Sequence, residues 1–148
     1  MTMFAIDTNI LIYAHNQDSA LHNQASAFLE RLMNEYDDEG NLEICLPAQV
    51  LMEFMNVITR ENLGKPLPLA DAITIVQDYI NSGIKIIHQQ ETQLKSCIDI
   101  LKAVKSRKKI FDVALAATLK DNNIEGIYTV NTADFKDFNF LHVQNPFE

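Results

Sequence analysis

The chain has 148 residues, of which 47% are hydrophobic and 22% charged, and it carries a formal net charge of −8. This length suits one domain with a substantial core, so we expect a single domain over residues 1–148, and the apolar fraction excludes a disordered chain. The negative charge excludes a protein that holds nucleic acid by bulk positive charge alone. No basic region precedes the N-terminal apolar run, so we expect no secretory signal, no membrane span and a cytoplasmic location.

Hydrophobic periodicity indicates an alternation of strands and helices along the chain. Short apolar runs predict strands, and apolar residues that recur every three or four positions predict helices. In chain order these elements are a strand at 3–6, helices at 10–14 and 19–36, a strand at 43–46, helices at 47–62 and 69–80, a strand at 84–88, helices at 94–104 and 111–122, and strands at 126–130 and 140–143, the last at a sheet edge. This alternation predicts an α/β sandwich around a parallel sheet.

Three acidic residues lie at strand ends or at a helix start. Asp7 follows the first strand, Asp112 opens an apolar helix, and Asp134 lies in the turn after the strand at 126–130. Each has an ordinary structural explanation, since Asp caps helices, favours their first turn and is common in turns. Parallel sheets also bind ligands beyond the carboxyl ends of their strands, so a functional role stays open for all three.

A fourth acid, Glu53, lies on a helix that is apolar on most of its surface. The polar residues of this helix follow one another at intervals of four, three and four, and therefore form one stripe: Gln49, Glu53, Asn56 and Arg60. The stripe could face solvent, with Glu53 contacting Arg60. We favour the alternative that Glu53 points into a polar cleft.

Four acids that met at one sheet edge would repel one another unless a cation were present. Oxygen ligands suit the hard cations Mg²⁺ and Mn²⁺, which activate water and neutralise phosphoryl charge, so phosphodiester hydrolysis is the chemistry that we expect. A basic run before Asp112 could attract a polyanion, or could simply be a solvated helix end. Its members are Lys102, Lys105, Arg107, Lys108 and Lys109.

Several segments together resemble the PIN-domain ribonucleases, and among them the VapC-type toxins of toxin–antitoxin pairs. The matching segments are Ala5-Ile6-Asp7-Thr8-Asn9-Ile10-Leu11, Leu51-Met52-Glu53-Phe54, Phe111-Asp112-Val113-Ala114-Leu115-Ala116-Ala117, Thr129-Val130-Asn131-Thr132-Ala133-Asp134-Phe135 and Asn145-Pro146. Each motif is weak alone, but their order and spacing make the set fairly specific. The resemblance spans nearly the whole chain.

The resemblance implies a PIN-like three-layer sandwich, a homodimer, an RNA substrate and an antitoxin that blocks the site. It implies Mg²⁺ or Mn²⁺ held by Asp7, Glu53 and Asp112, with Asp134 completing the catalytic set. Thr8 or Asn9 would orient Asp7 or contact phosphate, and Thr129 would position the turn that follows it. With the cations of the basic run, the expected substrate-binding residues are Thr8, Asn9, Thr129, Arg107, Lys108 and Lys109.

One position departs from the family pattern. Many relatives carry Asp where this chain has Asn131, whose amide oxygen can ligate a cation but brings no charge. Three hypotheses follow: an endoribonuclease toxin, a PIN nuclease that acts on DNA or other structured nucleic acid, and a catalytically decayed PIN-like binding module. A haloacid-dehalogenase-like phosphatase would need a second acid two residues after Asp7, where this chain has Asn9.

Overall fold

The computed structural model describes residues 2–104 and 107–148. The strands are β1 (Phe4–Ile6), β2 (Ile44–Pro47), β3 (Lys85–Ile87), β4 (Gly126–Tyr128) and β5 (His142–Gln144). The α-helices are α1 (Thr8–His15), α2 (His22–Leu32), α3 (Ala48–Ile58), α4 (Leu69–Asn81), α5 (Gln93–Ala103) and α6 (Ile110–Asp121). Two short 3₁₀ helices are η1 (Glu61–Leu63) and η2 (Thr132–Asp134). Within the described residues no helix is long and apolar enough to cross a membrane.

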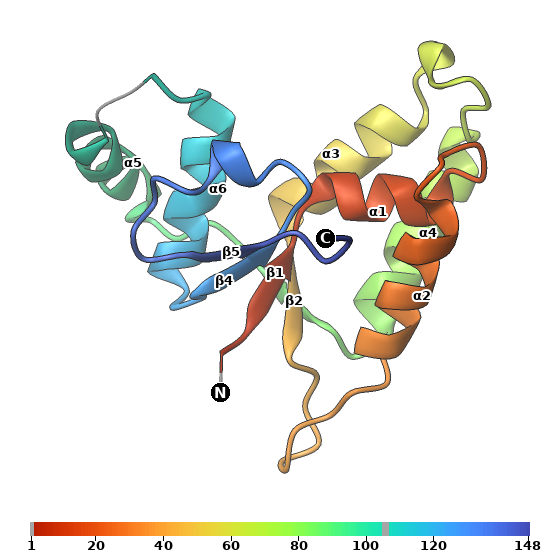
Figure 1. Cartoon of the computed structure of the whole chain (residues 1–148), viewed down its shortest axis with the longest axis horizontal. Coiled ribbons are helices and arrows are strands. Elements are labelled where there is room, and N and C mark those ends of the chain that lie inside the picture. The colour runs from red at the N-terminus through yellow and green to blue at the C-terminus, as the bar shows by residue number, and fades with distance from the viewer. Residues whose placement is uncertain (1, 105–106) are drawn as a thin grey trace.

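The five strands form one sheet in the order β3-β2-β1-β4-β5, and every neighbouring pair is parallel. The chain steps outward from β1 to β3 and then returns to β4 on the other side of β1. Because crossovers between parallel strands are right-handed, this reversal places α1–α4 on one face of the sheet and α5 and α6 on the other (Figure 1). The structure confirms the predicted α/β sandwich and the edge position of the last strand.

The strand order reverses between β1 and β4, so the connections that leave these two strands diverge onto opposite faces. A crevice forms at such a point, and it is where open α/β sheets bind ligands. Helix α6 leads into the start of β4 and therefore runs antiparallel to the strands, which brings its first turn to the same edge. The fold thus gathers the end of β1, the end of β4 and the start of α6 in one place.

The residues beneath this edge are tightly packed. Ala5 and Ile6 of β1 have no exposed surface, because both faces of the central strand are covered by helices. Ile10 and Leu11 of α1 are equally buried, as is Val113 of α6. Close-packed surroundings leave little room for movement, so the side chains at the crevice project from rigid elements.

Two predicted helices are shorter in the structure than in the prediction. The helix expected over residues 19–36 ends at Leu32, and Tyr36 pairs with Leu42 in an antiparallel bridge across a turn at Gly40, which has a φ of +83°. The helix expected over residues 47–62 begins after Pro47, ends at Ile58 and is followed by η1. In both cases the spacing of apolar residues stays helix-like for several positions beyond the point where a turn ends the helix.

Gly126 is expected to be intolerant of a side chain. A Cβ there would lie 2.6 Å from Cδ1 of Phe4 on the neighbouring strand, and the Phe4 ring stacks on Tyr128 with a centroid distance of 4.4 Å. We expect Gly126→Ala to lower the free energy of unfolding by about 1–3 kcal/mol, because the ring must move out of a packed position. Urea unfolding measures this. The double variant Phe4→Leu/Gly126→Ala should recover part of the loss, and an unchanged midpoint in Gly126→Ala would contradict the close packing.

Candidate functional site

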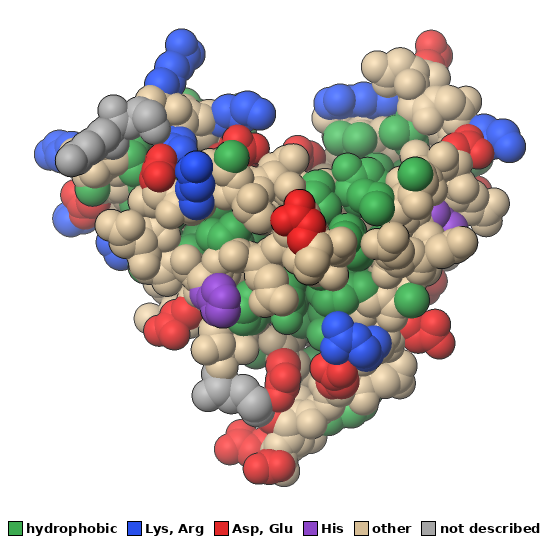
Figure 2. Space-filling view, viewed as in Figure 1, with side chains coloured by type: hydrophobic (Ala, Val, Ile, Leu, Met, Phe, Trp, Pro, Cys, Tyr) green, Lys and Arg blue, Asp and Glu red, His purple; other side chains and the backbone are tan. Residues whose placement is uncertain are grey.

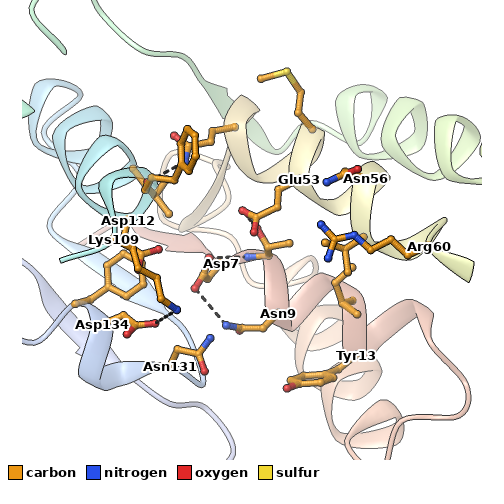
Figure 3. A pocket seen from close by; sticks show the side chains of 18 residues that line it. Asp7, Asn9, Tyr13, Glu53, Asn56, Arg60, Lys109, Asp112, Asn131 and Asp134 are labelled. Atoms are coloured by element: carbon orange, nitrogen blue, oxygen red, sulfur yellow. Dashed lines mark hydrogen bonds and ion pairs between the residues drawn. The ribbon is translucent and has the colours of Figure 1, made fainter. Parts of the chain in front are cut away.

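A cleft of about 870 Å³ opens at the carboxyl ends of β1 and β4. Its walls come from the starts of α1 and α6, from α3 and from η2. Figure 2 shows a notch between two lobes, with Lys and Arg side chains on both arms and acidic side chains near its base. The four acids selected from the sequence all line this cleft (Figure 3): Asp7, Glu53, Asp112 and Asp134. Segments that are distant in the chain therefore meet here.

Asp7 is the most buried of the four acids, with 8% of its surface exposed. It directly follows β1 and caps α1, where its Oδ1 accepts a hydrogen bond of 2.8 Å from the Thr8 backbone N–H. Its Oδ2 accepts from the Thr129 hydroxyl at 2.7 Å and from the Asn9 side-chain amide at 3.2 Å. These donors hold the carboxylate in place, and all of them are neutral.

Burial raises the pKa of Asp7 to about 6, because a carboxylate loses its hydration when it is enclosed. The hydrogen bonds from Thr129 and Thr8 oppose this shift, and the nearby acids Glu53 and Asp112 add to it. The net effect of these interactions is that the Asp7 side chain stays protonated to a higher pH than a free Asp side chain does. A cation at the cleft would reverse this balance and stabilise the ionised form.

Glu53 lies on α3 and is exposed to the cleft, where its Oε2 accepts a hydrogen bond of 3.1 Å from the Thr8 hydroxyl. Thr8 therefore links the start of α1 to α3. All members of the polar stripe of α3 line the cleft: Gln49, Glu53, Asn56 and Arg60. The stripe therefore faces a cleft, as we favoured from the sequence, and not open solvent.

Asp112 is half-buried in the first turn of α6, and Asp134 is half-buried in η2 across from it. Burial raises the pKa of Asp112, and the charge of Asp134 raises it further, whereas Lys109 lowers it. The Lys109 ammonium lies 3.9 Å from Asp134 Oδ2, which is the outer limit of an ion pair. Two acids in this cleft, Asp7 and Asp112, therefore have raised pKa values for the same reason, namely burial next to other acids.

A layer of polar residues supports the acids from behind. Thr129 has no exposed surface, and its hydroxyl also accepts from the Asn9 amide at 3.2 Å and from the Asn131 backbone N–H at 3.1 Å. Asn9 in turn accepts from the Val130 backbone N–H at 3.3 Å. Thr129 therefore holds Asp7 instead of facing the open cleft, which corrects its expected place among residues that contact substrate. Thr8, Asn9 and Asn131 do line the cleft.

The basic run is only partly directed to the cleft. Of its members that the structure describes, Lys109 lines the cleft, whereas Lys102, Arg107 and Lys108 do not. The Lys108 side chain is only 10% exposed, and its ammonium pairs with Asp137 at 2.8 Å. This pairing corrects the expectation that Lys108 is available to substrate. Lys105 lies outside the described residues.

The acids of the cleft fit a hard divalent cation by their chemistry. They supply only oxygen ligands, the most buried one has neutral hydrogen-bond donors, and their mutual repulsion falls when a cation binds. Among residues 2–104 and 107–148, no three acidic, His or Cys side chains form a ready-made metal site. The acids therefore share a cleft and would need to close around an ion.

Among the residues that line the cleft and had no predicted functional role, Arg60 and Phe111 stand out for their chemistry. Arg60 lines the cleft from the end of the α3 stripe, so its spacing from Glu53 was the available signal. Phe111 also lines the cleft, although 80% of its surface is exposed. Its only signal in the sequence was its position next to Asp112, because the apolar pattern of α6 would equally place it in the core.

Comparison with known proteins gives one relative over nearly the whole length of the chain and another over less than half of it. The chain is 29% identical over 147 residues to the protein named Ribonuclease VapC24 of Mycobacterium tuberculosis, covering 97% of each chain. It is 39% identical over 61 residues to VapC ribonuclease Mb2897 of Mycobacterium bovis, which is 41% of this chain and 38% of that protein.

Solved structures show the same fold. VapC20 of M. tuberculosis, described as a sarcin–ricin loop cleaving toxin, superposes with a TM-score of 0.68 at 14% identity, covering 96% of this chain and 99% of that chain. A toxin–antitoxin complex from Klebsiella pneumoniae gives a TM-score of 0.64 at 19% identity, with 98% of both chains covered. The PIN domain family profile matches residues 4–141, which includes every strand except the edge strand β5. The chain therefore belongs to the PIN domain family.

Proposed function

We propose that this chain is an endoribonuclease that hydrolyses RNA phosphodiester bonds with Mg²⁺ or Mn²⁺ as its cofactor. The observation that carries this proposal is the meeting of Asp7, Glu53, Asp112 and Asp134 in one cleft at the switch point of the sheet. Clustered carboxylates are the ligands of hard cations, and basic side chains beside them suit a polyanionic substrate. The full-length relative named a ribonuclease supports RNA as the substrate.

In this proposal Asp7, Glu53 and Asp112 hold the cation, and Asp134 with Asn131 completes its surroundings. When bound, a divalent cation supplies a more acidic water and offsets negative charge on the phosphoryl group. The hydroxyl of Thr129 and the amide of Asn9 keep Asp7 oriented toward the cleft. Glu53, whose Oε2 accepts a hydrogen bond from the Thr8 hydroxyl, would either complete the ligands of the cation or orient the attacking water. Lys109, which lines the cleft, would contact the phosphate backbone.

We further propose that the protein acts in the cytoplasm as the toxin of a toxin–antitoxin pair, as a homodimer that a cognate antitoxin inhibits. Support comes from the structural neighbours, which include the toxin–antitoxin complex from K. pneumoniae and VapBC2 of Rickettsia felis bound to a promoter DNA fragment (TM-score 0.64, 19% identity). The antitoxin would cover the cleft and displace RNA. Co-expression with the product of a neighbouring small gene, followed by co-purification and an activity assay, tests this pairing.

The test of the nuclease itself is cleavage of matched single-stranded RNA and DNA with Mg²⁺, with Mn²⁺, and with EDTA. We expect RNA cleavage that EDTA abolishes and that either cation restores. Cleavage that persists in EDTA would overturn the metal-dependent mechanism, and preferential cleavage of DNA would support the second enzyme hypothesis. A protein that neither cleaves RNA nor binds these cations in a calorimetric titration would be the decayed binding module.

Arg60 is expected to contact the RNA backbone on the α3 side of the cleft. The variant Arg60→Ala should weaken RNA binding several-fold and reduce the slope of log Kd against log salt by about 1, because one fewer counterion is released. Lys65→Ala is the matched control, since Lys65 is an exposed cation on the same lobe but does not line the cleft. Equal salt slopes for Arg60→Ala and the wild type would rule out a phosphate contact at this position.

A further inference from the structure

Phe111 occupies an unusual position for an aromatic side chain. Its exposed fraction of 80% is the highest among the large hydrophobic residues in the described part of the chain. It nevertheless lines the acidic cleft, one residue before Asp112. From Val113 onward α6 buries its large apolar side chains, including Leu115, whereas Phe111 and its neighbour Ile110, which is 61% exposed, lie at the surface. The core of the protein therefore does not require Phe111. An exposed aromatic ring inside a polar cleft indicates a binding role.

The backbone that carries this ring is fixed to the opposite wall of the cleft. The carbonyl oxygen of Phe111 accepts a hydrogen bond of 3.0 Å from the side-chain amide of Gln49 on α3. This bond joins residues 62 positions apart and ties the start of α6 to the polar stripe of α3. Met52 of α3 also lines the cleft and is 62% exposed, so it extends the apolar surface beside the ring. The ring is therefore presented to the cleft by a positioned backbone.

We propose that Phe111 is a stacking platform for an unpaired RNA base next to the phosphate that the acids engage, so that the substrate is a single-stranded region of RNA. This inference rests on the proposed ribonuclease function. Aromatic rings bind exposed bases by stacking, and nearby cations hold the backbone of the same strand. Lys109 and Arg60 supply those cations from the two walls of the cleft. Paired bases in a duplex are already stacked and cannot reach the ring.

A nucleic acid base fits this ring better than a protein partner does. A protein interface needs an extended apolar surface, with charged residues depleted at its centre. The concave cleft that the ring lines also contains apolar side chains, among them Met52, but its charged and amide lining is extensive, with four acids, four amides, Arg60 and Lys109. A flat base that approaches with its phosphate satisfies both the ring and the charges, because the two kinds of group lie side by side on one nucleotide strand.

The test is a double-mutant cycle between the ring and a base. The rate constant kcat/KM is measured for wild type and Phe111→Ala on single-stranded RNA, and on a series of RNAs that each carry one abasic nucleotide near the cleavage site. We expect Phe111→Ala to lower kcat/KM about tenfold on intact RNA, which is within the range for stacking one base. One abasic position should lower the wild-type value similarly while leaving Phe111→Ala almost unaffected, since each change removes the same contact.

Two further variants make the result specific. Phe111→Trp should retain near wild-type kcat/KM on intact RNA, because its ring still stacks. Leu94→Ala is the matched control, since Leu94 is 74% exposed on α5 and lies outside the cleft lining, and it should change nothing. Wild-type cleavage with unchanged kcat/KM in Phe111→Ala would overturn this inference alone. The inference would also fail if the losses in kcat/KM from Phe111→Ala and from the abasic nucleotide were additive at every position. It would fail as well if a changed oligomeric state of Phe111→Ala accounted for its loss of activity. Absence of any RNA cleavage by the wild type would overturn the proposed function itself.

Discussion

Replacement of Asp112 by Asn is expected to reduce RNA cleavage by about 10³-fold, which corresponds to about 4 kcal/mol of activation free energy. Asp112 lies in the cleft with Asp134 and Glu53, and burial together with the charges of both acids raises its pKa. In the proposed mechanism it supplies one of the negative charges that hold the cation. The amide of Asn keeps the shape of the side chain but loses that charge, so cation affinity and turnover fall together.

Folding should be nearly unaffected by this substitution, which separates chemistry from stability. Asp112 is only half-buried, and its favourable interaction with the start of α6 is worth about 0.3–1 kcal/mol. Asp78→Asn is the matched control, because Asp78 is exposed on α4 and lies outside the cleft lining. Single-turnover cleavage and urea unfolding are measured on both variants. Near wild-type cleavage by a folded Asp112→Asn protein would exclude Asp112 from the reaction.

The second large effect is on stability, and it concerns Asp7 in the metal-free protein. Burial raises the pKa of Asp7 from 3.8 to about 6, so the native state keeps this proton over a range in which the unfolded chain has released it. Where the native state binds more protons, the free energy of unfolding falls as pH rises. The wild type should therefore lose about 3 kcal/mol of stability through Asp7 as pH rises from about 3 to about 8.

Asp7→Asn removes this titration, so the variant should gain stability relative to the wild type as pH rises. The difference between their free energies of unfolding is expected to change by about 3 kcal/mol across the same pH range, measured by urea unfolding in EDTA. The pH-dependent change is the informative quantity, because the hydrogen bonds of the substituted amide with Thr8 and Thr129 alter both ends of the range alike. Added Mg²⁺ should stabilise the wild type more than the variant at high pH. A difference that is constant with pH would show that Asp7 ionises normally.

We expect the acids of the cleft to lower the stability of the metal-free protein and to be needed for its activity. A buried carboxylate at Asp7 lowers the stability of the metal-free protein, and the same carboxylate is a proposed ligand of the catalytic cation. Proteins commonly accept such a cost at functional sites. Removal of the charge at Asp7 should therefore move stability at high pH and activity in opposite directions. If Asp7 were only a helix cap, Asp7→Asn should change stability little, because Asn caps helices about as well as Asp does.

Local patterns in the amino-acid sequence were enough to predict the alternation of strands and helices and to select the four acids. These features are local: periodicity reports which face of an element is buried, and an acid inside an apolar run is visible without coordinates. The polar stripe is the clearest example, because Gln49, Glu53 and Asn56 lie on one face of any regular helix. Helix ends were less certain, and the helix expected to reach residue 36 stops at Leu32 because a turn and bridge follow.

How these elements meet, and where each side chain points, depends on the packing of the whole chain. The strand order places β1 beside β4, which brings Thr129 within 2.7 Å of Asp7, and no local pattern specifies that pairing. The same packing turns Lys108 toward Asp137 and leaves Phe111 exposed at the cleft. The physical reason is that periodicity acts within one element, whereas strand order and crossover handedness act between elements that are distant in the chain.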